Sequence, residues 1–330
     1  MTMYSVAVIG AGRIGTIHAE NINNHARLSL RYVVDYHEDS AKNLADKFGA
    51  KSTSLEHVLA DSSLDAVLIA SPTDTHANII LRCIDAGKSI FCEKPIDLNL
   101  ETSQKCLEAV NAGSIKFLLG FNRRYDPDFS KLKKSIIDGK IGALEMLQIT
   151  SHDPAPPPVN YINQSGGLFK DMTIHDFDMA RWLLNEKITE VFASGSCLVD
   201  PAIGEAGDID SAKIILKTAT GKLCTISNSR RAVYGYDQRI EVLGSTGLVK
   251  ADNILCSHVG LWNADGSQED RVQDFFLERY EAAYRIEISH FADVLADACA
   301  PQTSIEDGVE ALRLAEVAAQ SMASGQLIRI

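Results

Sequence analysis

The stretch that decides the fold is Val6-Ala-Val-Ile-Gly-Ala-Gly-Arg-Ile-Gly15, a short apolar run that leads into the pattern Gly-x-Gly-x-x-Gly. In this pattern Gly10 makes a tight turn, Gly12 lets a pyrophosphate approach the backbone, and Gly15 lets the following helix pack closely. A second apolar run ends at Asp35, twenty residues after Gly15. The strand, the glycines and the acidic residue at this spacing predict a dinucleotide-binding Rossmann domain.

The acidic residue also indicates which dinucleotide is bound. A carboxylate at Asp35 accepts hydrogen bonds from ribose hydroxyls and repels a 2′-phosphate, so we expect NAD rather than NADP. The glycines could instead form a turn in an α/β protein without a nucleotide, but the preceding strand and the helix-like stretch that follows favour the cofactor. The residues expected at the cofactor are Gly10, Gly12, Arg13, Ile14, Asp35, Ser71, Thr73, His76, Glu93 and Lys94.

The first 120 residues alternate between β-rich runs and helix-like stretches, which is typical of βαβ units around a parallel sheet. The predicted strands are 6–9, 30–34, 66–70, 89–92 and 117–119, and the predicted helices are Arg13–Asn23, 40–48, 76–86 and 100–110. We therefore predict an α/β protein whose N-terminal Rossmann domain spans residues 1–120.

Beyond Gly120 the predicted strands follow one another directly, at 144–151, 191–198, 212–217, 223–227 and 240–243. Their links are short and contain glycine, as in antiparallel hairpins. An amphipathic helix is predicted around 173–184. Residues 121–330 are therefore expected to form an α+β domain with a large, mostly antiparallel open sheet.

Composition and charge exclude several classes of protein. The chain has 330 residues, 45% of them hydrophobic and 23% charged, which fits a folded protein with two domains. Its formal net charge of −12, without a Lys/Arg block, would repel nucleic acid and anionic membranes. The N-terminus lacks the features of a signal peptide and no apolar run is long enough to span a membrane, so a cytoplasmic location is expected. Seven scattered cysteines without a C-x-x-C spacing indicate neither disulfides nor a thiolate metal site.

Three polar residues point to catalysis. Lys94 follows the predicted strand 89–92, at the carboxyl edge where open α/β sheets bind ligands. Asp171 and His175 lie four residues apart at a predicted helix start and thus share one face. Histidine titrates near neutral pH and can therefore serve as a general base. Taken alone, Asp171 and His175 would be helix-start and packing residues. A metal site is disfavoured because no cysteine or second histidine accompanies them.

Four motifs resemble the large family of glucose-fructose oxidoreductases and inositol dehydrogenases, and the similarity runs over nearly the whole chain. The motifs are Gly10-Ala-Gly-Arg-Ile-Gly15, Ala70-Ser-Pro-Thr-Asp-Thr-His76, Glu93-Lys-Pro95 and Gly120-Phe-Asn-Arg-Arg-Tyr-Asp126. A further segment, Gly166-Gly-Leu-Phe-Lys-Asp-Met-Thr-Ile-His-Asp-Phe-Asp178, is similar to the inositol 2-dehydrogenase branch of that family.

The resemblance implies a catalytic set of Lys94, Asp171 and His175. In this set His175 is the base, Asp171 orients its ring, and Lys94 hydrogen-bonds the reacting oxygen. Related enzymes also lead us to expect a cis peptide bond between Lys94 and Pro95, and a homotetramer formed through the open sheet face. Segments that face the substrate in the family match Asn122, Arg124, His152, Tyr161 and Tyr236.

The functional hypothesis is NAD-dependent oxidation of a ring hydroxyl of a cyclitol, with myo-inositol converted to 2-keto-myo-inositol as the leading reaction. An aldose or scyllo-inositol dehydrogenase of the same family is the alternative enzyme. A non-catalytic NAD-sensing regulator is the alternative from another class, but such modules typically lose the lysine or the histidine.

Overall fold

The computed structural model describes residues 2–330, which separate into two compact units. The first unit contains the chain up to Tyr125 and a returning segment from the C-terminal region, Ala282–Leu312. The second unit comprises Asp126–Glu281 and Arg313–Ile330. The sequence analysis placed a single boundary at residue 120 and gave the first domain no segment from the C-terminal region. The returning segment belongs to the first unit because Ile288 and Phe291 are buried in its hydrophobic core.

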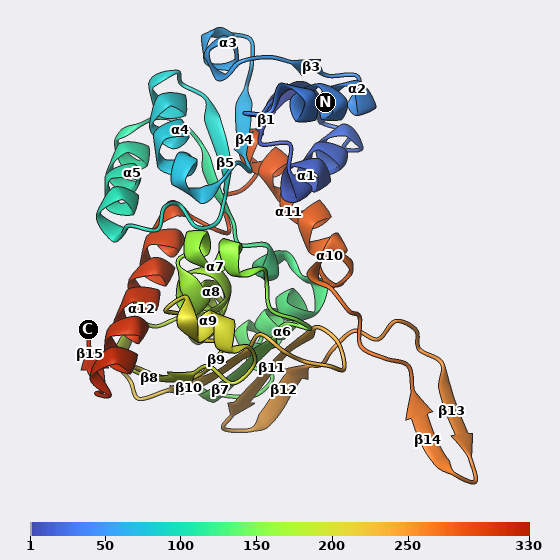
Figure 1. Cartoon of the computed structure of the whole chain (residues 1–330), viewed down its shortest axis with the longest axis vertical. Helices are drawn as coiled ribbons and strands as arrows, with labels where there is room; N and C mark the ends of the chain where they lie inside the picture. The colour runs from blue at the N-terminus through green and yellow to red at the C-terminus, as the bar shows by residue number, and fades with distance from the viewer. Residues whose placement is uncertain (1) are drawn as a thin grey trace. The chain divides into compact units, whose positions relative to one another are not determined.

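A six-stranded parallel sheet forms the centre of the first unit, as expected for a Rossmann fold (Figure 1). Its strand order is β3-β2-β1-β4-β5-β6, so the order reverses at β1. The strands are β1 (Tyr4–Ile9), β2 (Leu28–Val34), β3 (Lys51–Ser52), β4 (Ala66–Ile69), β5 (Ser89–Glu93) and β6 (Phe117–Gly120). All five predicted strands of this domain are present, and β3 is a further two-residue strand at the edge.

Helices connect these strands. They are α1 (Arg13–Asn23), α2 (Glu38–Phe48), α3 (Leu55–Ala60), α4 (Thr73–Asp85) and α5 (Leu100–Ala112), followed by the 3₁₀ turn η1 (Asn122–Tyr125). The helix α11 (Glu281–Leu295) adds its apolar side to the core on which β1 and β2 also pack. Helix α12 (Ile305–Ser324) begins in the first unit and ends in the second.

A seven-stranded mixed sheet forms the centre of the second unit, with the order β12-β11-β7-β10-β9-β8-β15. Only β7 and β10 pair in parallel; the other pairs are antiparallel, which confirms the predicted fold class. The strands are β7 (Leu144–His152), β8 (Ile188–Ser196), β9 (Ser211–Thr218), β10 (Leu223–Ser229), β11 (Asp237–Gly244), β12 (Gly247–Ala251) and β15 (Ile328–Arg329).

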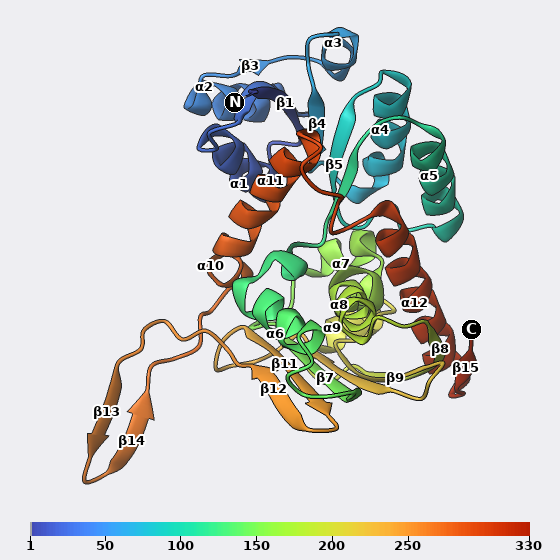
Figure 2. The ribbon, with the colours of Figure 1, turned by 180° about the vertical axis from the view of Figure 1, so that it is seen from behind.

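Helices cover one face of this sheet, and no helix of the second unit covers the other face (Figure 2). These helices are α6 (Pro127–Ile137), α7 (Val159–Ser165), α8 (Ile174–Leu184) and α9 (Pro201–Glu205), with the π-helical turn η2 (Phe169–Thr173) leading into α8 and the short α10 (Phe276–Arg279) following later. Side chains alternate accordingly along β9, where Ile214 and Leu216 are buried and Ile215 is exposed.

A separate hairpin of β13 (Gly260–Asn263) and β14 (Gly266–Glu269) projects from the second unit (Figure 1). Neither strand was predicted. Their side chains are almost all exposed, Trp262 among them, so the hairpin has no core that an apolar pattern would reveal. Among residues 2–330, no helix combines the length and the apolar character needed to cross a membrane.

Candidate active site

The carboxyl ends of the parallel strands bring the predicted cofactor residues of the first unit to one edge. In the register of the sheet Ile9 is aligned with Val34 and with Ile69, and Glu93 with Gly120. The residues that follow these positions therefore line the same edge, where open α/β sheets bind ligands. The structure thus places Gly10, Asp35, Ser71 and Lys94 at successive strand ends.

The glycine turn leaves no room for side chains at two of its three glycines. Gly10 has a φ of +102°, and a Cβ there would lie 2.5 Å from the carbonyl oxygen of Ala70. A Cβ on Gly15 would lie 1.9 Å from the carbonyl oxygen of Gly10. Above Gly12, by contrast, a Cβ would meet nothing within 4 Å.

This open side of the turn fits the pyrophosphate of NAD. Gly12 is the N-cap of α1 and offers no side chain to the N–H groups of the first helical turn. Arg13 and Ile14 are the first two residues of that turn. An uncapped helix N-terminus beside an accessible glycine backbone attracts a phosphate through its N–H groups and the helix dipole.

Asp35 is held at the end of β2 by backbone N–H groups. Its Oδ2 accepts a hydrogen bond from the N–H of Ala11 at 2.6 Å, and its Oδ1 accepts one from the N–H of His37 at 2.8 Å. Each carboxylate oxygen can accept a further hydrogen bond. The side chain is therefore oriented beside the glycine turn with acceptor capacity left for ribose hydroxyls.

His76 ties together two loops of the same edge. It is 1% exposed, and its Nε2 and Nδ1 lie 2.8 Å from the carbonyl oxygens of Ser71 and Pro95 respectively. The Ser71 hydroxyl lies 2.7 Å from that of Thr75, and Thr73 is the first residue of α4. Both nitrogens of His76 thus face protein carbonyls, and the residue links the two loops that contain Ser71 and Pro95.

Lys94 follows β5 directly, and its bond to Pro95 is cis, as expected. The backbone N–H of Lys94 donates to Oε2 of Glu93 at 3.3 Å, and Oε1 of Glu93 lies 2.6 Å from Nε2 of His18. Cys92, the residue before, is fully buried, and burial raises the pKa of its thiol well above the usual value. A thiol in this environment is a packing residue and not a nucleophile.

In the second unit, Asp171 and His175 come from two different kinds of helical turn. Asp171 lies in the π-helical turn η2, and His175 lies in the first turn of α8. The predicted helix start at 173 is thus close to the observed start of α8, but the sequence pattern did not reveal the wider turn before it. Single π-helical turns within helices are frequent at functional sites.

Two side chains hold the Asp171 carboxylate. The Tyr161 hydroxyl donates to its Oδ1 at 2.9 Å, and the Arg230 guanidinium lies 3.4 Å from its Oδ2. Arg230 is 1% exposed and the Asp171 side chain is 14% exposed, so the charge contact is partly shielded from water. Burial and the charge of Asp171 raise the pKa of the Tyr161 hydroxyl, which therefore stays protonated as a donor.

Arg230 is the residue of this group that the sequence analysis missed. It follows β10, and the pair Arg230-Arg231 after a strand carries no motif that distinguishes it from surface residues. Asn228, two residues earlier, was also missed, although it fixes the helix start: its side-chain oxygen accepts from Thr173, and its amide donates to Asp176, both at 2.7 Å.

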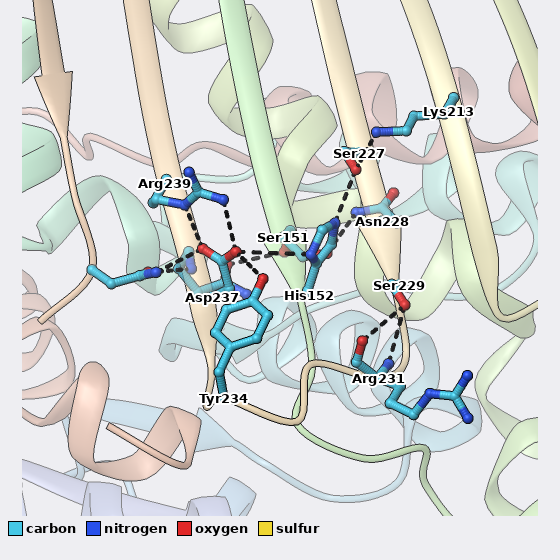
Figure 3. Close-up of polar contacts among 12 residues, drawn as sticks. Ser151, His152, Lys213, Ser227, Asn228, Ser229, Arg231, Tyr234, Asp237 and Arg239 are labelled. Atoms are coloured by element: carbon cyan, nitrogen blue, oxygen red, sulfur yellow. Dashed lines mark hydrogen bonds and ion pairs between the residues drawn. The ribbon is translucent and has the colours of Figure 1, made fainter. Parts of the chain in front are cut away.

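His152 lies in a different polar cluster, shown in Figure 3. Its Nε2 is 2.9 Å from the Ser227 hydroxyl and its Nδ1 is 3.8 Å from the buried carboxylate of Asp237. Ser151, the preceding residue of β7, points toward the face that the helices cover, so His152 points to the opposite face. Burial lowers the pKa of His152, and the charge of Asp237 offsets this only in part. The structure therefore does not bring His152 beside Asp171.

The other residues predicted to bind substrate have defined surroundings within their own units. Arg124 contacts the carboxylate of Asp307 at 2.9 Å and the carbonyl oxygen of Gln302 at 2.8 Å, and Asn122 is buried in the same turn η1. Tyr236 is buried, with its ring 6.0 Å from that of Tyr280. The Tyr161 hydroxyl donates a hydrogen bond to the predicted catalytic carboxylate of Asp171.

No cluster of three or more His, Cys, Asp or Glu side chains suited to a metal ion occurs in residues 2–330.

A matched pair of glycine variants separates folding from cofactor binding. Gly15→Ala forces a Cβ against the backbone of Gly10, so we expect a loss of stability of about 1–3 kcal/mol, as for overpacking. Gly12→Ala places a methyl group in open space, so the unfolding midpoint should stay close to that of the unmodified chain while NAD binding weakens. Thermal unfolding and calorimetric titration with NAD measure the two effects. Equal NAD affinity in Gly12→Ala and the unmodified chain would contradict the assigned pyrophosphate position.

Comparison with known proteins agrees with this geometry. Residues 4–121 match the model of an oxidoreductase family with an NAD-binding Rossmann fold, and residues 129–250 match the GFO/IDH/MocA C-terminal domain. An inositol 2-dehydrogenase of Rhizobium meliloti (strain 1021) is 47% identical over 323 residues, 98% of each chain. A scyllo-inositol 2-dehydrogenase (NAD(+)) of Bacillus subtilis (strain 168) is 34% identical over 98% of this chain and 95% of its own. The crystal structure of a myo-inositol dehydrogenase from Corynebacterium glutamicum superimposes with a TM-score of 0.95 at 42% identity, covering 99% of both chains. The chain therefore belongs to the GFO/IDH/MocA family of oxidoreductases, whose N-terminal domain is an NAD-binding Rossmann fold.

Proposed function

We propose that this oxidoreductase oxidises a ring hydroxyl of a cyclitol with NAD, and that its main reaction converts myo-inositol to 2-keto-myo-inositol. The observation that carries the proposal is the Asp171 carboxylate, held by Tyr161 and the buried Arg230 one π-helical turn before His175. A fixed carboxylate can orient a nearby imidazole and stabilise its cationic form, which supports a general base.

In the proposed reaction His175 takes the proton of the hydroxyl that is oxidised. Asp171 orients the imidazole and stabilises its cationic form, and the contacts to Arg230 and Tyr161 keep Asp171 in place. Lys94 donates a hydrogen bond to the reacting oxygen and stabilises negative charge that develops on it. Bound NAD supplies the acceptor for the hydride from the ring carbon. The alcohol thus loses a hydride and a proton and becomes a ketone.

The choice of substrate rests on the relatives. The inositol 2-dehydrogenase at 47% identity is closer to this chain than the scyllo-inositol 2-dehydrogenase at 34%, which favours myo-inositol. Scyllo-inositol and aldoses are the alternatives, because the same catalytic groups serve many polyols. Asn122, Arg124, His152, Tyr161 and Tyr236 remain predicted substrate residues. The cytoplasmic location expected from the sequence likewise stays a prediction.

Turnover with a panel of polyols tests this function. We expect NADH formation to be fastest with myo-inositol in a comparison with scyllo-inositol, glucose and galactose. In His175→Asn the loss of the base should lower kcat about 10²- to 10⁴-fold while the Kd for NAD stays unchanged. His258→Asn, at an exposed histidine outside this group, is the control and should keep full activity. Near-normal turnover in His175→Asn would remove His175 from the mechanism, and activity confined to aldoses would remove the inositol assignment.

We also propose that the chain assembles as a homotetramer through the open face of the second sheet. Five large apolar residues are exposed on this face although no element of the unit covers them: Met146, Ile215, Leu223, Leu243 and Leu248. Their positions alternate with buried residues of β7, β9, β10, β11 and β12. Apolar surface of this extent is unfavourable in water and is typical of a protein–protein interface.

Light scattering at micromolar concentration tests the assembly. We expect a mass about four times the chain mass of 36.0 kDa. Ile215→Glu places a charge at the centre of the open face and should lower the mass, because an unpaired charge in an interface is costly. Leu198→Glu changes a leucine that is more exposed than Ile215 and lies in the loop after β8, and should leave the mass unchanged. A monomeric mass for the unmodified chain would contradict the proposal.

A further inference from the structure

The first unit contains a buried histidine that neither the catalytic set nor the cofactor set uses. His18 lies in α1, one turn after Gly15, and is 0% exposed. Its ring packs edge-on against Phe91 of β5 and Tyr284 of α11, with centroid distances of 4.9 and 5.7 Å. A polar side chain in such an apolar enclosure is costly unless it is hydrogen-bonded.

Within residues 2–330, the polar partner of the His18 ring is Glu93. Nε2 of His18 lies 2.6 Å from Oε1 of Glu93. A carboxylate can only accept, so Nε2 carries the proton and donates. The other oxygen, Oε2, accepts from the backbone N–H of Lys94 at 3.3 Å. The Glu93 carboxylate thus links the interior of α1 to the backbone of Lys94.

Two neighbours restrict where the Glu93 carboxylate can lie. A Cβ added to Gly120 would come within 3.1 Å of its carboxyl carbon, so the absence of a side chain at the end of β6 makes room for it. Glu287 of α11 is fully buried, with neither carboxyl oxygen hydrogen-bonded within residues 2–330. Burial, and then the charge of Glu93, raise the pKa of Glu287 well above its usual value. The raised pKa favours the neutral form of Glu287.

We propose that His18 is a positioning residue for Lys94: through Glu93 it fixes the Lys94 backbone relative to α1, the helix that starts at the glycine turn. The inference rests on the role proposed above for Lys94. Helix α1 would then have two roles. Its N-terminus faces the cofactor, and its sixth residue, His18, holds the segment that contains Lys94. Misplacement of a catalytic group by about 1 Å can cost about 10²-fold in rate, so such an anchor matters for turnover.

Two variants of similar size separate the hydrogen bond from packing. His18→Leu fills the enclosure but cannot donate to Glu93, whereas the side-chain amide of His18→Gln can. Hydrogen–deuterium exchange of the peptide that covers Lys94 measures directly whether the Lys94 N–H stays hydrogen-bonded to Glu93. Pro95 has no N–H and adds no signal of its own. Steady-state kinetics with myo-inositol and calorimetric titration with NAD complete the comparison.

In His18→Leu we expect the Lys94 amide to exchange about tenfold faster and kcat to fall about tenfold or more, with the KM for the polyol and the Kd for NAD within threefold. His18→Gln should restore slow exchange and most of kcat. Unchanged Lys94 exchange in His18→Leu, or a His18→Gln protein as impaired as His18→Leu, would overturn the proposal. If the unmodified chain turned over none of the polyols, the proposed function would fail, but the exchange comparison would still decide whether His18 anchors Lys94.

Discussion

The close approach of Gly15 to the carbonyl of Gly10 is the constraint on which the first unit depends. A Cβ at Gly15 would lie 1.9 Å from that oxygen, so α1 can start where it does only with glycine at this position. Because α1 packs there, its uncapped N-terminus reaches the carboxyl edge of the sheet, and His18 reaches Glu93 in the interior. One steric condition therefore positions both the proposed pyrophosphate site and the proposed support of Lys94.

Local signals in the sequence were enough to predict the parallel sheet of the first unit. The glycine spacing, the strand that ends at Asp35 and the residues after each strand predicted the edge at which Gly10, Asp35, Ser71 and Lys94 meet. The return of Ala282–Leu312 to this unit could not be predicted, because an amphipathic helix shows that one side is buried but not which core buries it. The hairpin β13–β14 was missed for a related reason, since its exposed strands bury no alternate side chains.

The site in the second unit was predicted only in part. Asp171 and His175 were found from their spacing and their resemblance to a family, but the residues that fix them were not. Arg230 and Asn228 reach this site because β10 runs parallel to β7 beneath α8, which is a long-range arrangement. His152 stays a predicted substrate residue, but its contacts to Ser227 and Asp237, which follow from strand alternation, could not be read from the resemblance. Resemblance transfers the residue type, whereas the direction of a side chain depends on the register of its strand.

Transfer of an isotope from substrate to cofactor tests the central claim most directly. The claim is that a hydride leaves a ring carbon of myo-inositol for NAD while protein side chains handle the proton. With myo-inositol deuterated at C2, the account predicts that one deuterium per turnover appears in the nicotinamide ring of NADH, as measured by mass spectrometry. Turnover that yields only unlabelled NADH would show oxidation at another carbon. Failure of myo-inositol to reduce NAD at all would contradict the account.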